Sequence, residues 1–307
     1  MSNKHLVIGD FILDRFIYGD TLRVSAEAPT LVLDVTKKID SFGGAYNVVA
    51  HLCSLGDDCT FLTVVGGDYA SIIKDFDDIF LHNCNSHFIT DTERKTSLKT
   101  RLISNYKNSH LLRYDNESLH DISISIENSI VSYIENNISK YDTVILIDYK
   151  KGIITNSLAS KIIEIANNYN KFILVDTKRD DLSIFKRTTI IKPNKYEFTK
   201  IQLRYAPDLS IEEACKKITK ILNIKNIVIT DGENGIYLYD NDKQLSHING
   251  NKVQTTELSG AGDSVLATIG YCISRKDSIM DAVVSANKVA SKLVSLGVKY
   301  RARIEDL

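Results

Sequence analysis

The 307-residue chain has 38 basic and 39 acidic side chains, a formal net charge of −1, and 43% hydrophobic residues. This balance gives no electrostatic footprint for DNA, RNA or an anionic membrane, so we expect neither nucleic-acid nor membrane partners. An anionic ligand must instead be bound by a few local residues. The length allows one large α/β domain or two smaller ones.

The cysteines and the apolar runs indicate in which cellular compartment the protein is expected. Five cysteines, at positions 53, 59, 84, 215 and 272, are odd in number and include no CxxC pair. This pattern argues against a disulfide framework and against a zinc site. No apolar run approaches the roughly 20 residues that a membrane helix requires. We therefore expect a cytoplasmic protein with reduced thiols.

Short β-rich runs alternate with longer helical patterns along the chain. Strands are predicted at residues 5–8, 61–65, 143–147, 172–175, 189–191 and 227–229. Their continuous apolar character is typical of strands buried on both faces. Apolar residues recur at helical spacing from Ala45 to Leu55, and Gly56 ends that helix. The alternation predicts an α/β fold in which helices cover both faces of a mostly parallel sheet.

Two regions break this alternation. Residues 11–36 and about 87–114 contain strand-like runs at 30–36 and 97–103 but no long helix. We expect them to form a small β sheet that projects from the main domain as a lid. The chain has only three prolines and no low-complexity tract, so no linker between domains stands out.

Polar residues follow most of the predicted strands. Ligands of open α/β sheets bind beyond the carboxyl ends of the strands, so these residues are candidates for a site. Asp and Asn are also common helix caps and turn formers, and we expect about half of the set to be structural. The set is Asp10 and Asp14 after the first strand, Asp148 after the third, Asp176 and Lys178 after the fourth, Asn194 and Glu197 after the fifth, and Thr230 and Asp231 after the sixth.

Two glycine-containing turns precede predicted helices. In Gly43-Gly44-Ala45-Tyr46-Asn47 the glycines allow close approach of a ligand, and Asn47 supplies a donor and an acceptor. In Ser259-Gly260-Ala261-Gly262-Asp263 the glycine amides can point at an anion, and Asp263 can accept a proton from an attacking hydroxyl. Taken alone, each turn is about equally compatible with an ordinary helix start.

The order of these motifs resembles the ribokinase-like PfkB family of carbohydrate kinases over nearly the full chain. Gly43-Gly44-Ala45-Tyr46-Asn47 is similar to the family's sugar motif. Asn194-Lys195-Tyr196-Glu197 is similar to its NxxE metal motif, and Ser259-Gly260-Ala261-Gly262-Asp263 to its DTxGAGD motif. Three motif matches in the same order as in the family argue against coincidence.

Within that family the chain resembles the heptose-phosphate kinases of ADP-heptose synthesis. Residues 9–19 and 23–29 are similar to that group's GDxxLDRYxYG and RISPEAP runs. Asp148-Tyr149-Lys150-Lys151-Gly152 resembles its DYxKG, and Asp176-Thr177-Lys178 its DPK. The resemblance implies a single kinase domain over residues 1–307, without the nucleotidyltransferase domain of bifunctional relatives. It also implies a homodimer that pairs through the lid.

The implied reaction is transfer of a phosphoryl group from ATP to the anomeric hydroxyl of D-glycero-D-manno-heptose 7-phosphate. By resemblance Asp263 is the general base, and the amides of Gly260, Ala261 and Gly262 form an anion hole. Mg²⁺ would be organised by Asn194 and Glu197 through water.

The resemblance also assigns the binding residues. An isolated Arg or Lys most often lies on the solvated surface. Lys151 and Lys178 are therefore the stronger candidates for phosphate binding, because the motifs around them match those of the family. The sugar would contact Asp14, Gly43, Gly44, Asn47 and Asp148, its phosphate would meet cations among Arg15, Arg101, Arg113, Lys151 and Lys178, and ATP would lie near Asn194, Glu197, Thr230, Gly232, Gly235 and Asn287.

Three positions depart from the family pattern, and two other functions stay open. Tyr46, Thr177 and Ser259 replace a small residue, a proline and a threonine. Tyr46 could reshape a sugar pocket or point into the helix packing. The alternatives are a related kinase for fructose phosphate, ribose or a nucleoside, and a regulator that binds nucleotide and sugar without catalysis. The intact Asp263 and NxxE motif favour the enzyme.

Overall fold

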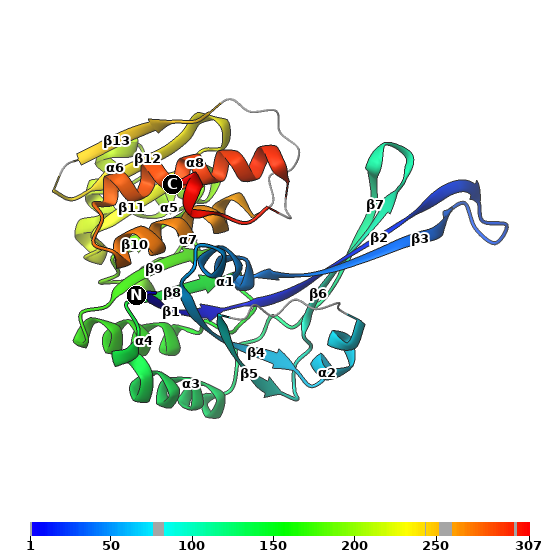
Figure 1. The fold of residues 1–307 in the computed structure, drawn as a ribbon, viewed down its shortest axis with the longest axis horizontal. Helices are drawn as coiled ribbons and strands as arrows, with labels where there is room; N and C mark the ends of the chain where they lie inside the picture. The colour runs from blue at the N-terminus through cyan, green and yellow to red at the C-terminus, as the bar shows by residue number, and fades with distance from the viewer. Residues whose placement is uncertain (1, 76–82, 243, 252–259, 298–299) are drawn as a thin grey trace.

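A nine-stranded sheet forms the centre of the main body (Figure 1). The computed structural model describes residues 2–75, 83–242, 244–251, 260–297 and 300–307. In sheet order the strands are β13 (Gln244–Asn249), β12 (Gly235–Asp240), β11 (Asn226–Thr230), β10 (Ile190–Ile191), β9 (Phe172–Thr177), β8 (Thr143–Asp148), β1 (Lys4–Gly9), β4 (Asp58–Gly66) and β5 (Cys84–Asp91).

Neighbouring strands from β11 to β5 are all parallel, and β12 and β13 add an antiparallel edge. The predicted mostly parallel sheet is therefore confirmed. The run predicted at 189–191 forms only a two-residue strand. Pro193 follows one intervening residue after its end, and a proline has no N–H to extend the hydrogen-bonded ladder.

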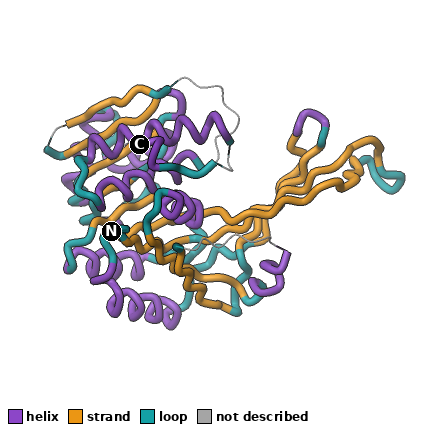
Figure 2. Tube along the Cα trace, in the orientation of Figure 1, coloured by secondary structure: helices purple, strands orange, loops and turns teal. Residues whose placement is uncertain are grey.

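Helices cover both faces of the sheet (Figure 2). One face carries α1 (Ala45–Ser54), α7 (Ala261–Ser274) and α8 (Ile279–Leu296), and the other carries α3 (Ile124–Asn137), α4 (Asn156–Asn168), α5 (Lys195–Tyr205) and α6 (Ile211–Leu222); the short α2 (Tyr69–Ile72) lies beyond β4. Successive strand residues point to opposite faces. Thus Val7 belongs to the core beneath α1 and α7, whereas Leu6 and Ile8 belong to the core beneath α3 and α4.

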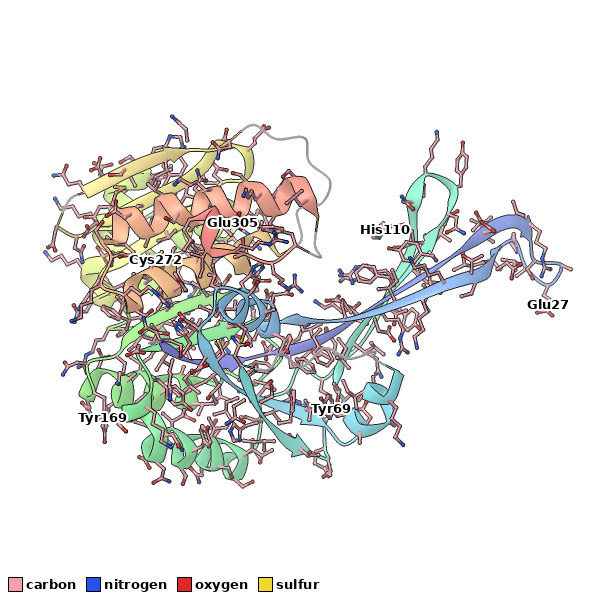
Figure 3. The ribbon with its side chains drawn as sticks, viewed as in Figure 1. Glu27, Tyr69, His110, Tyr169, Cys272 and Glu305 are labelled. Atoms are coloured by element: carbon pink, nitrogen blue, oxygen red, sulfur yellow. The ribbon has the colours of Figure 1, made fainter. Side chains whose placement is uncertain are left out.

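A second, four-stranded sheet projects from the body (Figures 1 and 3). Its order is β3 (Leu31–Gly44), β2 (Phe11–Val24), β6 (Ser97–Ser104) and β7 (Ser109–Asn116). Glu27 lies in the turn at its tip and His110 on β7 (Figure 3). We call this sheet the lid.

The lid boundaries differ from the expected 11–36 and 87–114. β3 continues to Gly44 because β2 has 14 residues and its antiparallel partner has to match that length. Residues 87–91 belong instead to β5, which pairs in parallel with β4 at the edge of the main sheet.

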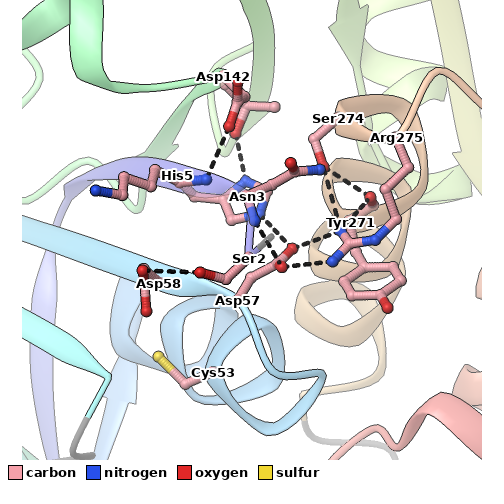
Figure 4. Close-up of polar contacts among 12 residues, drawn as sticks. Ser2, Asn3, His5, Cys53, Asp57, Asp58, Asp142, Tyr271, Ser274 and Arg275 are labelled. Carbon is pink, nitrogen blue, oxygen red and sulfur yellow. Dashed lines mark hydrogen bonds and ion pairs between the residues drawn. The ribbon is translucent and has the colours of Figure 1, made fainter.

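A buried carboxylate anchors the far end of α7 (Figure 4). Asp57 accepts hydrogen bonds from Arg275 at 2.6 and 2.7 Å, and its Oδ2 lies 2.9 Å from the His5 Nε2. Burial alone would raise the pKa of Asp57, but the Arg275 and His5 contacts lower it to about 2. This network connects the C-terminal end of α7 to β1 and to the turn before β4. It thereby fixes the position of the helix, and so of its N-terminal end, relative to the sheet.

Within the described ranges, no helix combines the length and the apolar character that crossing a bilayer requires.

Candidate active site

Two adjoining cavities open beside the N-terminus of α7. The larger has a volume of about 690 Å³ and the smaller about 210 Å³, and Gly260 lines both. The larger is lined by strand ends and helices of the main body, whereas the lid supplies much of the smaller one. Of the predicted residues, Lys178, Asn194, Thr230, Gly232, Gly235, Gly260, Ala261, Gly262, Asp263 and Asn287 line the larger cavity, and Asp14, Asn47, Arg101 and Gly260 line the smaller.

The Gly-Ala-Gly turn starts α7. Gly260 is its N-cap with φ +81°, a conformation that favours glycine, and no described side chain caps the helix. The first amides of a helix have no intrahelical acceptor, and here they face the larger cavity. Ser259 of the predicted motif lies outside the described residues. The arrangement provides donors and a positive helix end for an anion.

Asp263 lies in the first turn of α7, buried and held from two sides. The Asn47 Nδ2 donates to its Oδ2 at 3.0 Å, and the Tyr149 hydroxyl donates to its Oδ1 at 2.9 Å. Burial, with a further contribution from the charge of Asp176, raises the pKa of Asp263 to about 6. Burial also raises the pKa of Tyr149 well above its ordinary value, so its hydroxyl keeps its proton and donates. A carboxylate with a pKa near neutrality suits a general base.

The larger cavity next to Asp263 is lined by Lys178, Lys192 and Asp176, whereas Glu197 pairs with Lys178 without lining it. The buried Lys192 lies 2.8 Å from Asp176 Oδ2, and Lys178 donates to Glu197 at 2.6 Å and lies 3.8 Å from Asp176 Oδ1. A Cβ added at Gly262 would come within 3.2 Å of the Lys192 Nζ, so Lys192 lies directly beneath the glycine turn. Positive charge therefore accompanies the helix N-terminus in this cavity.

The NxxE motif forms a capping box at the start of α5. Asn194 Oδ1 accepts from the Glu197 amide at 2.8 Å, and Glu197 Oε2 accepts from the Asn194 amide at 2.9 Å. An isolated bridge pairs Asn194 with Thr230 and brings this motif beside the end of β11. Asn194 and Glu197 therefore cap the start of a helix, which is the structural role that Asn and Glu often have at such positions.

Five of the six residues predicted to contact ATP line the same cavity, and Glu197 does not. Gly232 and Gly235 both have positive φ, and an added Cβ at Gly235 would overlap the Ile248 carbonyl. The Asn287 side chain donates to the Asn249 carbonyl at 2.8 Å and so connects α8 to β13. A volume of about 690 Å³ falls within the range of small-molecule sites.

The smaller cavity lies between the lid and the body. Arg101 on β6 donates to Asp14 Oδ1 at 2.6 Å, and Gly43 leaves no room for a Cβ beside the Asp14 carboxylate. Gly44, with φ +61°, turns the chain into α1, which carries Asn47. The cavity therefore joins a carboxylate, an amide and a cation close to Asp263.

Tyr46 packs into the core and does not line either cavity in the described part of the chain. Its ring meets Phe11, Phe42 and Phe61 edge-on, with centroids 6.3, 5.1 and 5.7 Å away. Of the two possibilities for this residue, the packing role is the one observed.

Seven of the ten predicted substrate residues do not line the smaller cavity. Gly43 and Gly44 lie beside the Asp14 carboxylate and the Asp10 carbonyl. Four of the other five have partners outside the cavity. Arg15 pairs with Asp40 at 2.8 Å, and because it neighbours Asp14 on β2 its side chain leaves the lid on the opposite face. The remaining three have partners elsewhere: Arg113 is exposed beside Asp115, Lys151 pairs with Glu117, and Asp148 is buried against Arg179 and Thr177. Lys178, the fifth, lies on the side of the larger cavity.

Several residues around these cavities were missed by the sequence reasoning. Tyr149 lies inside the quoted Asp148-Tyr149-Lys150-Lys151-Gly152 run, and Lys192 directly precedes Pro193-Asn194, so both had a motif nearby. His51, His110 and Arg301 line the smaller cavity without any such sequence signal.

Comparison with known proteins agrees with this picture. The model of the pfkB family carbohydrate kinases matches residues 2–297. The bifunctional protein HldE of Aliarcobacter butzleri is 34% identical over 294 residues, which are 94% of this chain and 60% of that protein. HldE of Campylobacter jejuni is 32% identical over 293 residues, covering 95% of this chain and 61% of that protein. The chain thus spans about 60% of the length of these relatives.

Solved structures share the fold at low identity. Phosphofructokinase-2 from Escherichia coli, in complex with potassium, has a TM-score of 0.76 at 16% identity. The match covers 99% of this chain and 96% of the phosphofructokinase chain. Ribokinase from Arabidopsis thaliana, complexed with ribose and ATP, has a TM-score of 0.69 at 16% identity. The match covers 100% of this chain and 96% of the ribokinase chain.

Together these observations define an α/β protein with the ribokinase-like fold. Since the family match extends over nearly all residues, the chain belongs to the pfkB family of carbohydrate kinases.

Proposed function

We propose that this kinase phosphorylates the anomeric hydroxyl of D-glycero-D-manno-heptose 7-phosphate and forms the 1,7-bisphosphate for ADP-heptose or related nucleotide-sugar synthesis. The buried Asp263 carboxylate next to both cavities carries the proposed chemistry. The heptose-kinase motifs in the sequence and the HldE relatives support the acceptor.

In the proposed reaction ATP occupies the larger cavity and the sugar the smaller one. Asp263 accepts the proton of the anomeric hydroxyl as that oxygen attacks the γ-phosphorus and the bond to the ADP oxygen breaks. The amides of Gly260, Ala261 and Gly262 meet the negative charge of the transferring group. Because the transition state is loose, positioning and charge stabilisation matter more than deprotonation. Removing one such donor costs about 3 kcal/mol of barrier.

The chemistry of the donors fits a hydrated Mg²⁺. No group of three or more His, Cys, Asp or Glu side chains in the described ranges could hold a metal ion by itself. Asp176 Oδ1 is buried without a hydrogen-bond partner at the larger cavity, which Asn194 also lines, and Glu197 lies next to it through its pair with Lys178. We propose that these residues hold Mg²⁺ through its waters. When bound, Mg²⁺ would neutralise charge on the ATP phosphates.

We also propose a homodimer that forms through the lid. Its far half exposes Leu22, which is 91% accessible, together with Val24, Leu31 and Val35. Exposed apolar side chains gathered at one end of a sheet are typical of an interaction surface. Sedimentation of the wild-type protein tests this, and a monomer at micromolar concentration would contradict it.

An acceptor panel tests the proposed substrate. ADP release is measured with heptose 7-phosphate, fructose 6-phosphate, ribose and a nucleoside, and the heptose phosphate is expected to give the highest kcat/KM. Preferential turnover of another acceptor would disprove the heptose assignment and leave the kinase assignment intact. Binding of ATP and sugar without turnover of any acceptor would favour the regulator.

The pH dependence of the reaction should follow Asp263. Only the ionised carboxylate can accept a proton, so kcat/KM is expected to fall about tenfold per pH unit below about pH 6 and to level off above it. In Tyr149→Phe a hydrogen bond that lowers the pKa of Asp263 is lost, so this inflection should move to higher pH. Tyr141→Phe, which removes a buried hydroxyl from the core on the other face, is the control. An unshifted inflection in Tyr149→Phe would refute the assignment.

A further inference from the structure

The segment of residues 300–307, which follows α8, lies beside the smaller cavity. Arg301 in this segment lines the cavity, as does Arg101 from the lid. The two arginines therefore come from parts of the chain about 200 residues apart, one on the lid and one on the body, and they converge only in the folded protein.

Arg101 alone is a weak binding site for a phosphate. Its guanidinium is already 2.6 Å from the Asp14 carboxylate, which offsets its charge. The other predicted cations, such as Lys151 with Glu117 and Arg15 with Asp40, have partners outside the cavity. Of the described side chains that line the smaller cavity, Arg301 carries the second guanidinium, and one of its N–H groups donates to the Tyr300 carbonyl at 3.0 Å.

The backbone next to Arg301 is held by a buried histidine on α1. The Ala302 amide donates to His51 Nδ1 at 3.1 Å, and both residues are buried. Burial, with the nearby charge of Arg301, lowers the pKa of His51 to about 3. The ring is therefore neutral at neutral pH, and its Nδ1 stays an acceptor.

The rest of the segment is tied to α8 and to itself. The Lys288 Nζ donates to the Leu307 carbonyl at 2.8 Å, and the Arg303 amide donates to Asp306 Oδ2 at 2.8 Å. Lys292 of α8 forms an ion pair with Asp306. These contacts fix the segment on the C-terminal side of Ala302, and with the His51 hydrogen bond they preorganise the position of Arg301 at the cavity.

We propose that Arg301 is a specificity residue that binds the phosphate of the sugar acceptor together with Arg101, and that His51 is a positioning residue that holds Arg301 at the cavity. This rests on the proposed function as a sugar-phosphate kinase. A guanidinium binds a phosphate through two parallel N–H···O bonds, which a neutral sugar cannot form. The pair of arginines thereby selects phosphorylated over unphosphorylated sugars.

The test is the kinetics of Arg301→Met with paired acceptors at saturating ATP. The pairs are heptose 7-phosphate with heptose and fructose 6-phosphate with fructose. KM for the phosphorylated member is expected to rise about 10- to 100-fold, as for a lost charge-assisted hydrogen bond. KM for the unphosphorylated member and for ATP should change less than about twofold. Arg303→Met is the matched control, because Arg303 lies in the same segment, exposed and paired with Glu305.

His51 is tested by two substitutions and one measurement on the wild type. His51→Asn keeps an acceptor near the Nδ1 position and should behave as wild type, whereas His51→Leu should reproduce the KM change of Arg301→Met. If His51→Leu fails to fold, the positioning role of His51 is tested by hydrogen exchange of the Ala302 amide in the wild type. Strong protection supports the positioning role, and rapid exchange overturns it.

The outcomes separate this inference from the heptose assignment. If the wild type prefers fructose 6-phosphate, the heptose assignment fails, and the Arg301 comparison continues with that acceptor. A wild type without preference for phosphorylated sugars overturns the inference. It is also overturned if Arg301→Met lowers kcat but leaves the preference unchanged, since Arg301 would then act on the transferring group.

Discussion

Asp263→Asn is expected to lower kcat by about 10²- to 10⁴-fold while ATP and acceptor still bind. The amide has nearly the same shape as the carboxylate but cannot accept the proton of the attacking hydroxyl. Asn47 can still donate to the amide oxygen, and the Tyr149 hydroxyl can turn to accept from the new amide group. Single-turnover kinetics and nucleotide titration measure the two effects separately.

The stability of this variant provides an internal control. The pKa of Asp263 in the folded protein, about 6, is above its ordinary value of 3.8, so folding disfavours the ionised form and this cost grows as pH rises from about 4 to 6. At pH 8 the asparagine variant should therefore unfold no more easily than the wild type. Asp281→Asn, in the first turn of α8, should leave kcat unchanged. Wild-type activity in Asp263→Asn would disprove the proposed mechanism.

Lys192→Met is expected to destabilise the protein by about 3 kcal/mol or more. Lys192 and Asp176 are both buried and 2.8 Å apart, so removing the ammonium leaves a carboxylate charge with little compensation. Lys178, 3.8 Å from the other oxygen, offsets only part of this cost. Urea denaturation measures the loss. Nucleotide affinity should fall as well, because Lys192 lines the larger cavity.

Two further variants show whether the unpaired charge is the cause. Adding Asp176→Asn to Lys192→Met should recover much of the stability, since no buried charge then remains unpaired. Lys178→Met should cost less than about 1 kcal/mol, because its pair with Glu197 is partly exposed. Equal losses in both lysine variants would contradict this account.

The lid illustrates what periodicity alone could predict. Strand patterns without an intervening helix indicated a second sheet, and such a sheet is present. Its boundaries depended on pairing partners distant in sequence: β3 matches the length of β2, and residues 87–91 join β4. Because local sequence does not specify a strand's partner, the boundaries were the weaker part of the prediction.

The charged residues show a similar division. Asp263, Asn47 and Asn194 lie in short motifs whose backbone conformation is local, with glycines or a helix start beside them. Arg15 and Arg101 cannot be told apart in this way, because strand pairing decides which face of the lid each one occupies. Asp40 then neutralises Arg15, while Arg101 reaches the cavity.

The α/β alternation, the glycine turns and the carboxylate at the start of α7 can be predicted from the sequence alone, because buried strands, helix starts and tight turns depend on nearby residues. The cations that surround the acceptor cavity can be identified only in the folded chain. The tertiary structure placed Lys192 beneath Gly262, buried Tyr46 among aromatic rings and brought Arg301 to the lid side of α1 through His51. These contacts join residues far apart in the chain, and packing, rather than local propensity, selects them.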